Sequence, residues 1–287
     1  MNKKKRKRII KISIFLLMIA WMIICQFIMQ FRERDDYLKN KFKEKGIDLF
    51  TATVKIGDHD IHYGKTGTDS ASTLFFIHGT PGSLNDFGMY LADSELTRHY
   101  RLISVDRPGF GYSDFGNTMD LEHQAKLISL LIDSLSNNKP VYLIGHSLAG
   151  PLVIKLAAMK TSTVGGILVL AGSTDPSQEP ARWWRPIITY SPLRWMIPTA
   201  LRYSNEEQYW LKDDLVKLKD DFPGVTCRVH IFHGDNDDLV PAANAGYTKK
   251  MLVNSKNVTT TIFPRGDHFM VWNKYEEIKK QLLDQEH

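Results

Sequence analysis

The chain has 287 residues, of which 43% are hydrophobic and 24% are charged, and its formal net charge at pH 7 is +5. The length permits one large domain or two small ones. Seven of the positive charges lie between residues 3 and 11, so the remainder is close to neutral, which argues against a nucleic-acid-binding protein. With only two cysteines, in the apolar N-terminal segment and beside a predicted strand, a disulfide framework is excluded.

An uncharged apolar segment follows the basic block. From Ile12 to Phe31 no side chain is charged, and Ile, Leu, Phe, Met and Trp dominate. A helix of about twenty residues spans about 30 Å, the thickness of the hydrocarbon core of a bilayer. We therefore expect residues 12–31 to form one uncleaved transmembrane helix. A cleaved signal peptide and a buried helix are the alternatives.

The charges on either side of this segment predict its orientation. Positive charge tends to stay on the cytoplasmic side of a membrane. Residues 1–11 are therefore expected to be cytoplasmic, close to anionic lipid headgroups. Residues 32–49 are then a linker, and residues 50–287 form a folded domain on the extracytoplasmic side of the cell membrane.

The first clear strand of this domain is Thr73–Ile77, a short apolar run. It leads into the turn His-Gly-Thr-Pro-Gly at 78–82. Backbone N–H groups in such a turn can bind an anion, and the N–H of Thr80 is the best candidate.

A second strand is predicted at Leu102–Val105, followed by the glycine-rich loop Asp-Arg-Pro-Gly-Phe-Gly-Tyr-Ser at 106–113. We expect Asp106 and Arg107 to brace this loop, which would shape one wall of a pocket.

A third strand, Val141–Ile144, leads into Gly-His-Ser-Leu-Ala-Gly at 145–150, and a helix is predicted over Pro151–Lys160. A serine at such a strand-to-helix turn exposes its hydroxyl at the sheet edge, and small neighbours let the backbone turn. The turn also aims the N–H of Leu148, at the start of the helix, toward a forming oxyanion. The motif therefore proposes Ser147 as a nucleophile.

A candidate acid follows the strand Val229–Phe232. In this type of site the chain order is nucleophile, acid, histidine, and the loop after the strand reads His-Gly-Asp-Asn-Asp-Asp-Leu-Val-Pro. An acid on a loop after a strand lies at the same edge of the sheet as the nucleophile. Spacing alone leaves Asp235, Asp237 and Asp238 as competitors.

A candidate histidine follows the β-branched strand Thr259–Phe263. His268 lies in the loop after this strand, and an amphipathic helix is expected from Val271 to Gln285. Because no Cys/His cluster has metal-ligand spacing, we expect no metal and no cofactor; His59 and His62 are expected to be strand residues.

Strand and helix signals alternate evenly, which predicts one α/β domain with a mostly parallel sheet flanked by helices. From about residue 50 to the C-terminus the chain resembles the α/β-hydrolase family. The motifs that carry this resemblance occur in the family's order, each after a strand-like run: HGTPG (78–82), DRPGFGYS (106–113), GHSLAG (145–150), HGDNDDLVP (233–241) and GDHF (266–269).

The resemblance implies a Ser-His-Asp triad. The family's acid falls on Asp237 and its histidine on His268, so Ser147 would be the nucleophile, His268 the general base and then acid, and Asp237 the orienting carboxylate. The N–H groups of Thr80 and Leu148 would form the oxyanion hole.

The resemblance also implies a small helical lid. In this family an insertion covers the pocket, and here it corresponds to residues 175–223. This segment is rich in aromatic side chains, which favours an apolar acyl or aromatic substrate. The aromatic residues in question are Trp183, Trp184, Tyr190, Trp195, Tyr203, Tyr209 and Trp210.

We therefore expect a membrane-anchored serine hydrolase that cleaves a carboxylic ester or related acyl bond of an apolar or lipid-like small molecule. A serine at position 147 argues against family members that open epoxides or displace halide, which generally place an aspartate there. A peptidase or carbon–carbon bond hydrolase on the same fold is an alternative, and a binding protein without catalytic activity is another.

Overall fold

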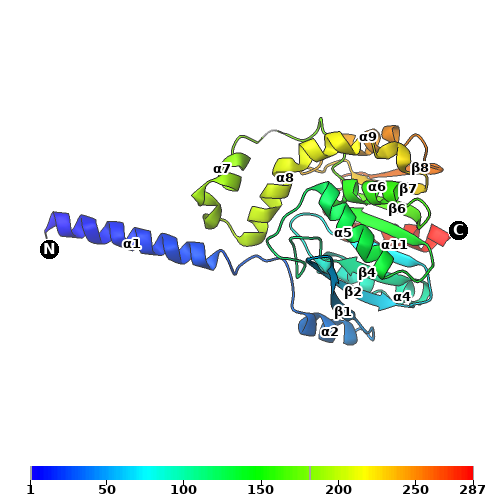
Figure 1. The fold of residues 1–287 in the computed structure, drawn as a ribbon, viewed down its shortest axis with the longest axis horizontal. Coiled ribbons are helices and arrows are strands. Elements are labelled where there is room, and N and C mark those ends of the chain that lie inside the picture. The colour runs from blue at the N-terminus through cyan, green and yellow to red at the C-terminus, as the bar shows by residue number, and fades with distance from the viewer. Residues whose placement is uncertain (1, 181, 287) are drawn as a thin grey trace.

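The structure, a computed structural model, describes residues 2–180 and 182–286. An eight-stranded sheet lies at its centre, with the strand order β1-β2-β4-β3-β5-β6-β7-β8 (Figure 1). The strands are β1 (Phe50–Ile56), β2 (His59–Gly67), β3 (Thr73–Ile77), β4 (Arg101–Val105), β5 (Val141–His146), β6 (Val164–Leu170), β7 (Arg228–Gly234) and β8 (Asn257–Phe263).

The sheet is mostly parallel, as predicted. From β4 through β3, β5, β6 and β7 to β8, every neighbouring pair of strands is parallel. The pairs β1–β2 and β2–β4 are antiparallel. The predicted strand at 73–77 has the predicted bounds, and β7 and β8 each begin earlier than expected. Parallel strands place their carboxyl ends at one edge, so the loops after β3, β5, β7 and β8 meet there.

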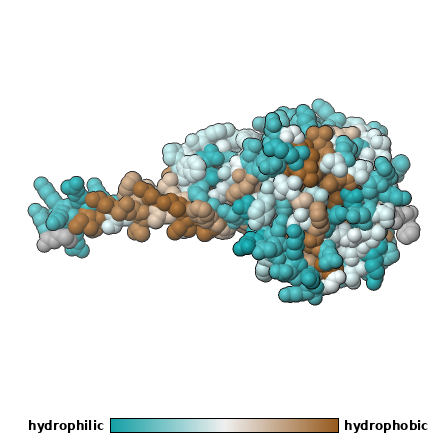
Figure 2. Space-filling view, turned by 60° about the horizontal axis from the view of Figure 1, so that its bottom comes forward, coloured by the Kyte–Doolittle hydropathy of each residue, from teal (hydrophilic) through white to brown (hydrophobic). Residues whose placement is uncertain are grey.

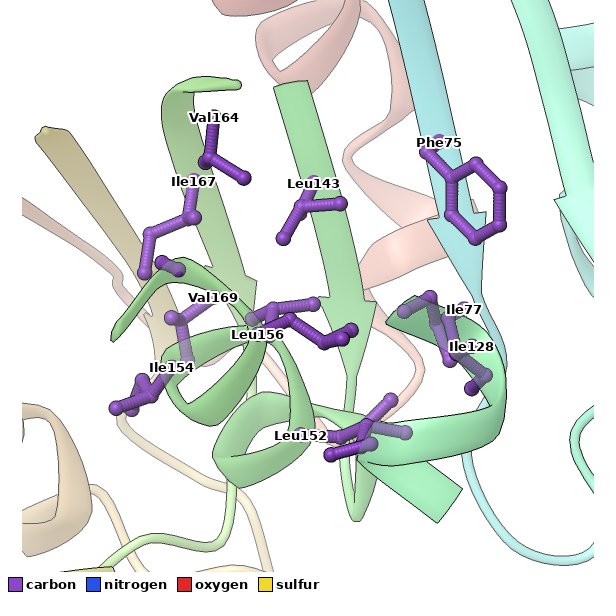
Figure 3. Close-up of a cluster of buried hydrophobic side chains, with 14 of the residues drawn as sticks. Phe75, Ile77, Ile128, Leu143, Leu152, Ile154, Leu156, Val164, Ile167 and Val169 are labelled. Atoms are coloured by element: carbon purple, nitrogen blue, oxygen red, sulfur yellow. The ribbon is translucent and has the colours of Figure 1, made fainter. Parts of the chain in front are cut away.

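Helices cover both faces of the sheet because successive side chains of a strand point to opposite faces. Phe75 and Ile77 of β3 belong to one apolar cluster, and Leu74 and Phe76 belong to the other. The first cluster includes side chains of α5 (Leu121–Ser134), α6 (Ala149–Met159) and α9 (Ala243–Met251), and Figure 3 shows part of it around β5. The second includes α2 (Asp35–Lys43), α3 (Gly88–Leu91), α4 (Ser94–His99), α10 (Met270–Asn273) and α11 (Tyr275–Leu283).

A mainly helical segment lies between β6 and β7, where the lid is expected. Its helical parts are α7 (Arg185–Tyr190), the 3-10 turn η2 (Pro192–Met196), α8 (Thr199–Leu218) and the short turn η3 (Phe222–Gly224). The later half of α8 packs into the first apolar cluster through Leu211, Leu215 and Leu218. Its earlier half and α7 stand out from the sheet layers (Figure 1).

The prediction of one transmembrane helix over residues 12–31 is wrong. The helix that forms, α1 (Lys3–Ile24), begins inside the basic block and ends seven residues before Phe31. Its uncharged part, residues 12–24, is about 20 Å long at 1.5 Å per residue, which is shorter than the hydrocarbon core of a bilayer. Among the residues described, none of the helices has the length and apolar character needed to cross a membrane.

The helix α1 ends where its chain begins to bind η2 and α8. Thr199 of α8 donates its backbone N–H to the Cys25 carbonyl at 3.0 Å, and its hydroxyl lies 3.2 Å from the same oxygen. Trp21 donates its indole N–H to the Met196 carbonyl at 2.9 Å. The rest of α1 buries no side chain and projects from the body, with apolar side chains behind a hydrophilic tip (Figure 2).

The segment expected to be a linker, residues 32–49, also belongs to the folded body. It contains α2, which buries Leu38 and Phe42 in the second apolar cluster, followed by the buried side chains of Ile47 and Leu49. The apolar side chains of this segment recur at helical spacing, and their burial explains why it packs against the sheet.

Candidate active site

Ser147 lies in a strained turn between β5 and α6. Its φ is 56°, the left-handed region that residues other than glycine seldom adopt. A Cβ at Gly145 would lie 2.4 Å from the carbonyl oxygen of Ala149, and one at Gly150 would lie 2.6 Å from the Cα of Gly172. These two glycines allow the close approach, and Ala149, where the G-x-S-x-G motif has glycine, is accommodated fully buried.

The structure brings together the three side chains predicted from far apart in the sequence. His268 Nε2 lies 3.0 Å from Ser147 Oγ, and His268 Nδ1 lies 2.8 Å from Asp237 Oδ2. Gly234 and Phe263, the last residues of β7 and β8, are register partners, so the two loops start side by side. The result is a continuous hydrogen-bonded chain from carboxylate to imidazole to hydroxyl.

Of the three competing acids, the imidazole reaches Asp237. Asp235 and Asp238 are exposed, and Asp235 accepts the Arg265 N–H at 2.5 Å. Asp237 alternates with its exposed neighbours and points inward, where its side chain is fully buried.

The carboxylate of Asp237 is held in its charged form. Burial favours a higher pKa for this carboxyl, but the hydrogen bond from His268 and the amides of Val240 and Leu239 outweigh it and leave the pKa below the usual value. The other carboxylate oxygen accepts those two amides at 2.8 and 2.9 Å. An ionised acid in this position can stabilise an imidazolium on His268.

Three further histidines lie in or near this site, and burial keeps all three neutral. Burial lowers the pKa of His146 to about 3, and its electrostatic interaction with His268 acts in the same direction. Burial likewise lowers the pKa of His78 and of His233. His146 Nε2 lies 3.0 Å from the His268 carbonyl and His233 Nε2 lies 2.9 Å from the Val240 carbonyl, so both rings fix the backbone of the triad loops.

The turn at 78–82 lies against the nucleophile. Ile77, at the end of β3, pairs with Gly145 near the end of β5. A Cβ at Gly79 would lie 3.0 Å from the Cβ of Ser147, a tight contact that shows how closely the turn approaches the nucleophile. Thr80, the predicted oxyanion donor, follows directly, and Leu148 precedes the first residue of α6.

Asp106 braces the loop at 106–113, as predicted, whereas the side chain of Arg107 reaches the turn at 78–82. Asp106 accepts the backbone N–H of Leu84 at 2.6 Å and of Tyr112 at 2.8 Å, and it pairs with His62 Nδ1 at 2.8 Å. Arg107 is fully buried and reaches the turn at 78–82.

Two partners of the Arg107 side chain were not predicted from the sequence. Gln124 of α5 and Glu207 of α8 both accept from its NH1 group at 2.7 Å. Glu207 is 100 residues from Arg107 and belongs to no recognisable motif. The only hint was indirect. A buried arginine needs a carboxylate partner, but this rule does not identify which acidic residue supplies it.

The arrangement supports nucleophilic chemistry at a carbonyl. It combines a hydroxyl at a strained turn, an imidazole within reach as base, and an ionised acid behind the imidazole. In the part of the chain that the structure describes, no three His, Cys, Asp or Glu side chains are grouped to hold a metal ion.

Comparison with known proteins identifies the family of the fold. A family model described as "Alpha/beta hydrolase family" matches residues 74–279. A 2-hydroxy-6-oxononadienedioate/2-hydroxy-6-oxononatrienedioate hydrolase from Paraburkholderia phymatum is 32% identical over 125 residues. That match covers 41% of this chain and 42% of the relative, so less than half of the relative's length is spanned.

Two longer matches extend over most of the chain. A non-heme haloperoxidase from Rhodococcus erythropolis is 24% identical over 263 residues, covering 75% of this chain and 92% of the relative. The crystal structure of a bacterial membrane phospholipase A superposes with a TM-score of 0.62 at 16% identity and covers 97% of both chains. At that identity the structural match speaks for the fold alone.

Proposed function

Since this chain belongs to the alpha/beta hydrolase family, we propose that it is a serine hydrolase that cleaves a carboxylic ester or related acyl bond. Ser147, His268 and Asp237 form the triad in this proposal, and Thr80 and Leu148 supply the oxyanion-hole N–H groups. The substrate is an apolar or lipid-like small molecule.

The reaction proceeds in two halves. Ser147 Oγ attacks the carbonyl carbon while His268 Nε2 takes its proton, and the negative oxygen is stabilised by the two N–H groups. His268 then gives the proton to the departing alcohol, leaving an acyl-enzyme. Water, deprotonated by the same imidazole, attacks the acyl group and regenerates Ser147.

The observation that carries this proposal is the unbroken contact chain at the triad. With Nδ1 of His268 at 2.8 Å from an ionised carboxylate, that nitrogen carries the proton. The other ring nitrogen, at 3.0 Å from Ser147 Oγ, is then free to accept one.

The lid supports an apolar substrate. Trp183 is 79% exposed and Tyr190 is 68% exposed, an arrangement that costs free energy in water unless these rings meet another apolar surface.

Full-length protein assayed on p-nitrophenyl esters of increasing acyl length tests the proposal. We expect hydrolysis by the wild type and by Ser134→Ala, a control at an exposed serine of α5, and none above background by Ser147→Ala. A fluorophosphonate probe should label the first two and not the third. An inert wild type that the probe does not label contradicts the proposal.

A carbon–carbon bond hydrolase is the second candidate, favoured by the relative from Paraburkholderia phymatum, whose name describes a dienedioate hydrolase. The same triad would serve that reaction. A vinylogous 1,5-diketone acid offered beside the esters distinguishes the two, because a carbon–carbon hydrolase should turn over the diketone much faster.

The cell-membrane location with an extracytoplasmic domain was predicted from the basic block at residues 3–11 followed by a membrane span, and no helix among the described residues supplies that span. A reporter active only in the cytoplasm, fused to the C-terminus, tests it. Signal from this fusion contradicts the predicted orientation.

A further inference from the structure

The guanidinium of Arg107 is fully buried, yet each of its N–H groups has an acceptor. Nε donates to the His78 carbonyl and NH2 to the Gly79 carbonyl, both at 2.8 Å. NH1 donates to Gln124 and Glu207, and NH2 also reaches Glu207. Arginine has five donors in a rigid planar fork, and here all five are used.

Two of these contacts set the orientation of one peptide group. The Gly79 carbonyl oxygen accepts from Arg107 NH2 at 2.8 Å and lies 2.7 Å from His78 Nδ1. The same planar peptide carries the N–H of Thr80. In a trans peptide the carbonyl and the N–H point in opposite directions, so fixing the Gly79 oxygen fixes the direction of the Thr80 N–H.

The remaining acceptor comes from the lid. Glu207 of α8 binds Arg107 through both carboxylate oxygens, at 2.7 and 2.9 Å, and its side chain is 2% exposed. Gln124 also donates to Glu207 at 2.7 Å, so the carboxylate is held on two sides. The ring of Phe110 lies 4.9 Å below the guanidinium. A bidentate pair of this kind has little freedom to rotate.

We propose that Glu207 is a positioning residue for the oxyanion hole, acting through Arg107 on the Gly79–Thr80 peptide. The seating of α8 on the body and the direction of the Thr80 N–H are then one coupled arrangement. A displacement of this part of the lid withdraws the carboxylate, loosens the guanidinium, and lets the peptide rotate. This inference rests on the proposed acyl hydrolysis.

A purely structural role for Glu207 makes a different prediction. It would lower stability and reduce activity on every substrate equally. A positioning role instead weakens stabilisation of a negative oxygen, while binding of the acyl chain is retained. The distinguishing measurement is therefore the ratio of kcat/KM for an ester to that for its thionoester, in which sulfur replaces the carbonyl oxygen. Oxyanion-hole donors are placed for oxygen, so losing their alignment lowers the ester rate more.

The variants are Glu207→Gln, which keeps the shape and loses the charge, and Glu207→Ala. We expect kcat for the ester to fall about tenfold to a hundredfold in Glu207→Ala, below the full loss of one oxyanion donor. KM should stay nearly constant, and the ester-to-thionoester ratio should fall in parallel with kcat. Glu207→Gln should show the same changes in smaller measure.

Glu206→Gln is the matched control. Glu206 is the neighbouring buried carboxylate of α8, and it binds Arg194 of the lid and Thr118, not the turn at 78–82. Its ester-to-thionoester ratio should equal that of the wild type. Thermal unfolding of each variant checks that it is folded, and the isosteric Glu207→Gln serves if Glu207→Ala does not fold.

The outcomes separate the two proposals. An active wild type with an unchanged ratio in the Glu207 variants overturns the positioning role and leaves the serine hydrolase standing. The same fall in ratio in Glu206→Gln also overturns it, because lid disturbance in general would then be the cause. A wild type inert toward every ester overturns both.

Discussion

The sheet beneath the site and the first half of α8 are held by opposite means. Around β5 and α6 the buried side chains are almost all apolar, as Figure 3 shows for Leu143, Leu152 and Ile154. In the first half of α8, the buried side chains are mostly polar or charged, and neighbouring α7 and η2 turn apolar side chains to solvent. The buried polar residues there are Thr199, Arg202, Ser204, Asn205, Glu206 and Glu207.

This difference bears on what each region does. Apolar packing is non-directional and depends on filled volume, so it secures a sheet edge without specifying fine angles. Hydrogen-bonded ion pairs contribute less net stability but fix geometry. The body therefore supplies stability, and the contacts of α8 specify orientation close to the reacting groups.

The largest expected effect concerns the triad itself, which lies on the body side. In Asp237→Asn the amide cannot hold the His268 proton on Nδ1, so kcat for an ester should fall by about 10⁴-fold. The fold should be retained, as judged by circular dichroism. Asp235→Asn, at an exposed acid two residues away, should keep full activity; an equal loss there would contradict the assignment of the acid.

The next effect compares an apolar side chain packed in the sheet with an apolar side chain exposed in η2. Leu143→Ala in fully buried β5 should lower the free energy of unfolding by about 2–5 kcal/mol, because it removes contacts and leaves a cavity. Leu193→Ala in η2, where the side chain is 55% exposed, should stay within about 0.5 kcal/mol of the wild type. Urea unfolding measures the loss of unfolding free energy in each variant. Similar losses in the two variants would contradict this prediction.

A smaller, pH-dependent effect concerns a carboxyl of the body. Burial raises the pKa of Asp86 to about 7, and a Cβ on Gly82 would lie 2.3 Å from its carboxylate. A raised acid pKa means that the folded state holds a proton the unfolded state has released. Stability should therefore decline from about pH 4 to about pH 7 and then level off.

The variant Asp86→Asn should remove that decline. Its gain over the wild type should be near zero below pH 4 and reach at most about 4 kcal/mol above pH 7. Thermal unfolding across this pH range is the measurement. A gain that does not depend on pH would mean that the change acts through packing instead.

The smallest effect is expected at the exposed aromatic surface of the lid. Trp183→Ala should change the free energy of unfolding by no more than about 0.5 kcal/mol. If this ring meets the acyl chain, kcat/KM should fall for long-chain esters and stay constant for acetate. Equal changes for both chain lengths would remove Trp183 from substrate recognition.

The sequence predicted the parts of the molecule that depend on local pattern. The strand Thr73–Ile77 is predicted by its run of apolar residues. The turn at Ser147 is predicted by small residues that directly follow a strand. The choice of Asp237 needed the family resemblance, because three acids share one loop. Its burial depends on how that loop folds against β8, which spacing does not determine.

The sequence failed where distant segments decide the outcome. The pairing of Arg107 with Glu207 joins residues 100 positions apart, and neither has a periodic signal. The prediction of a transmembrane helix at 12–31 was wrong for a related reason. Hydropathy describes the run as uniform, whereas Cys25 and Gln26 leave the helix and bind α8.

The junction at Cys25 has a practical consequence for anyone who shortens this protein. Gln26 Oε1 lies 3.4 Å from the guanidinium of Arg202, a side chain only 2% exposed. Deleting the first thirty-odd residues would uncover that cation and free the Thr199 amide. A truncated protein chosen for easier purification would thus carry an altered α8, and we expect its substrate preference to differ from that of the whole chain.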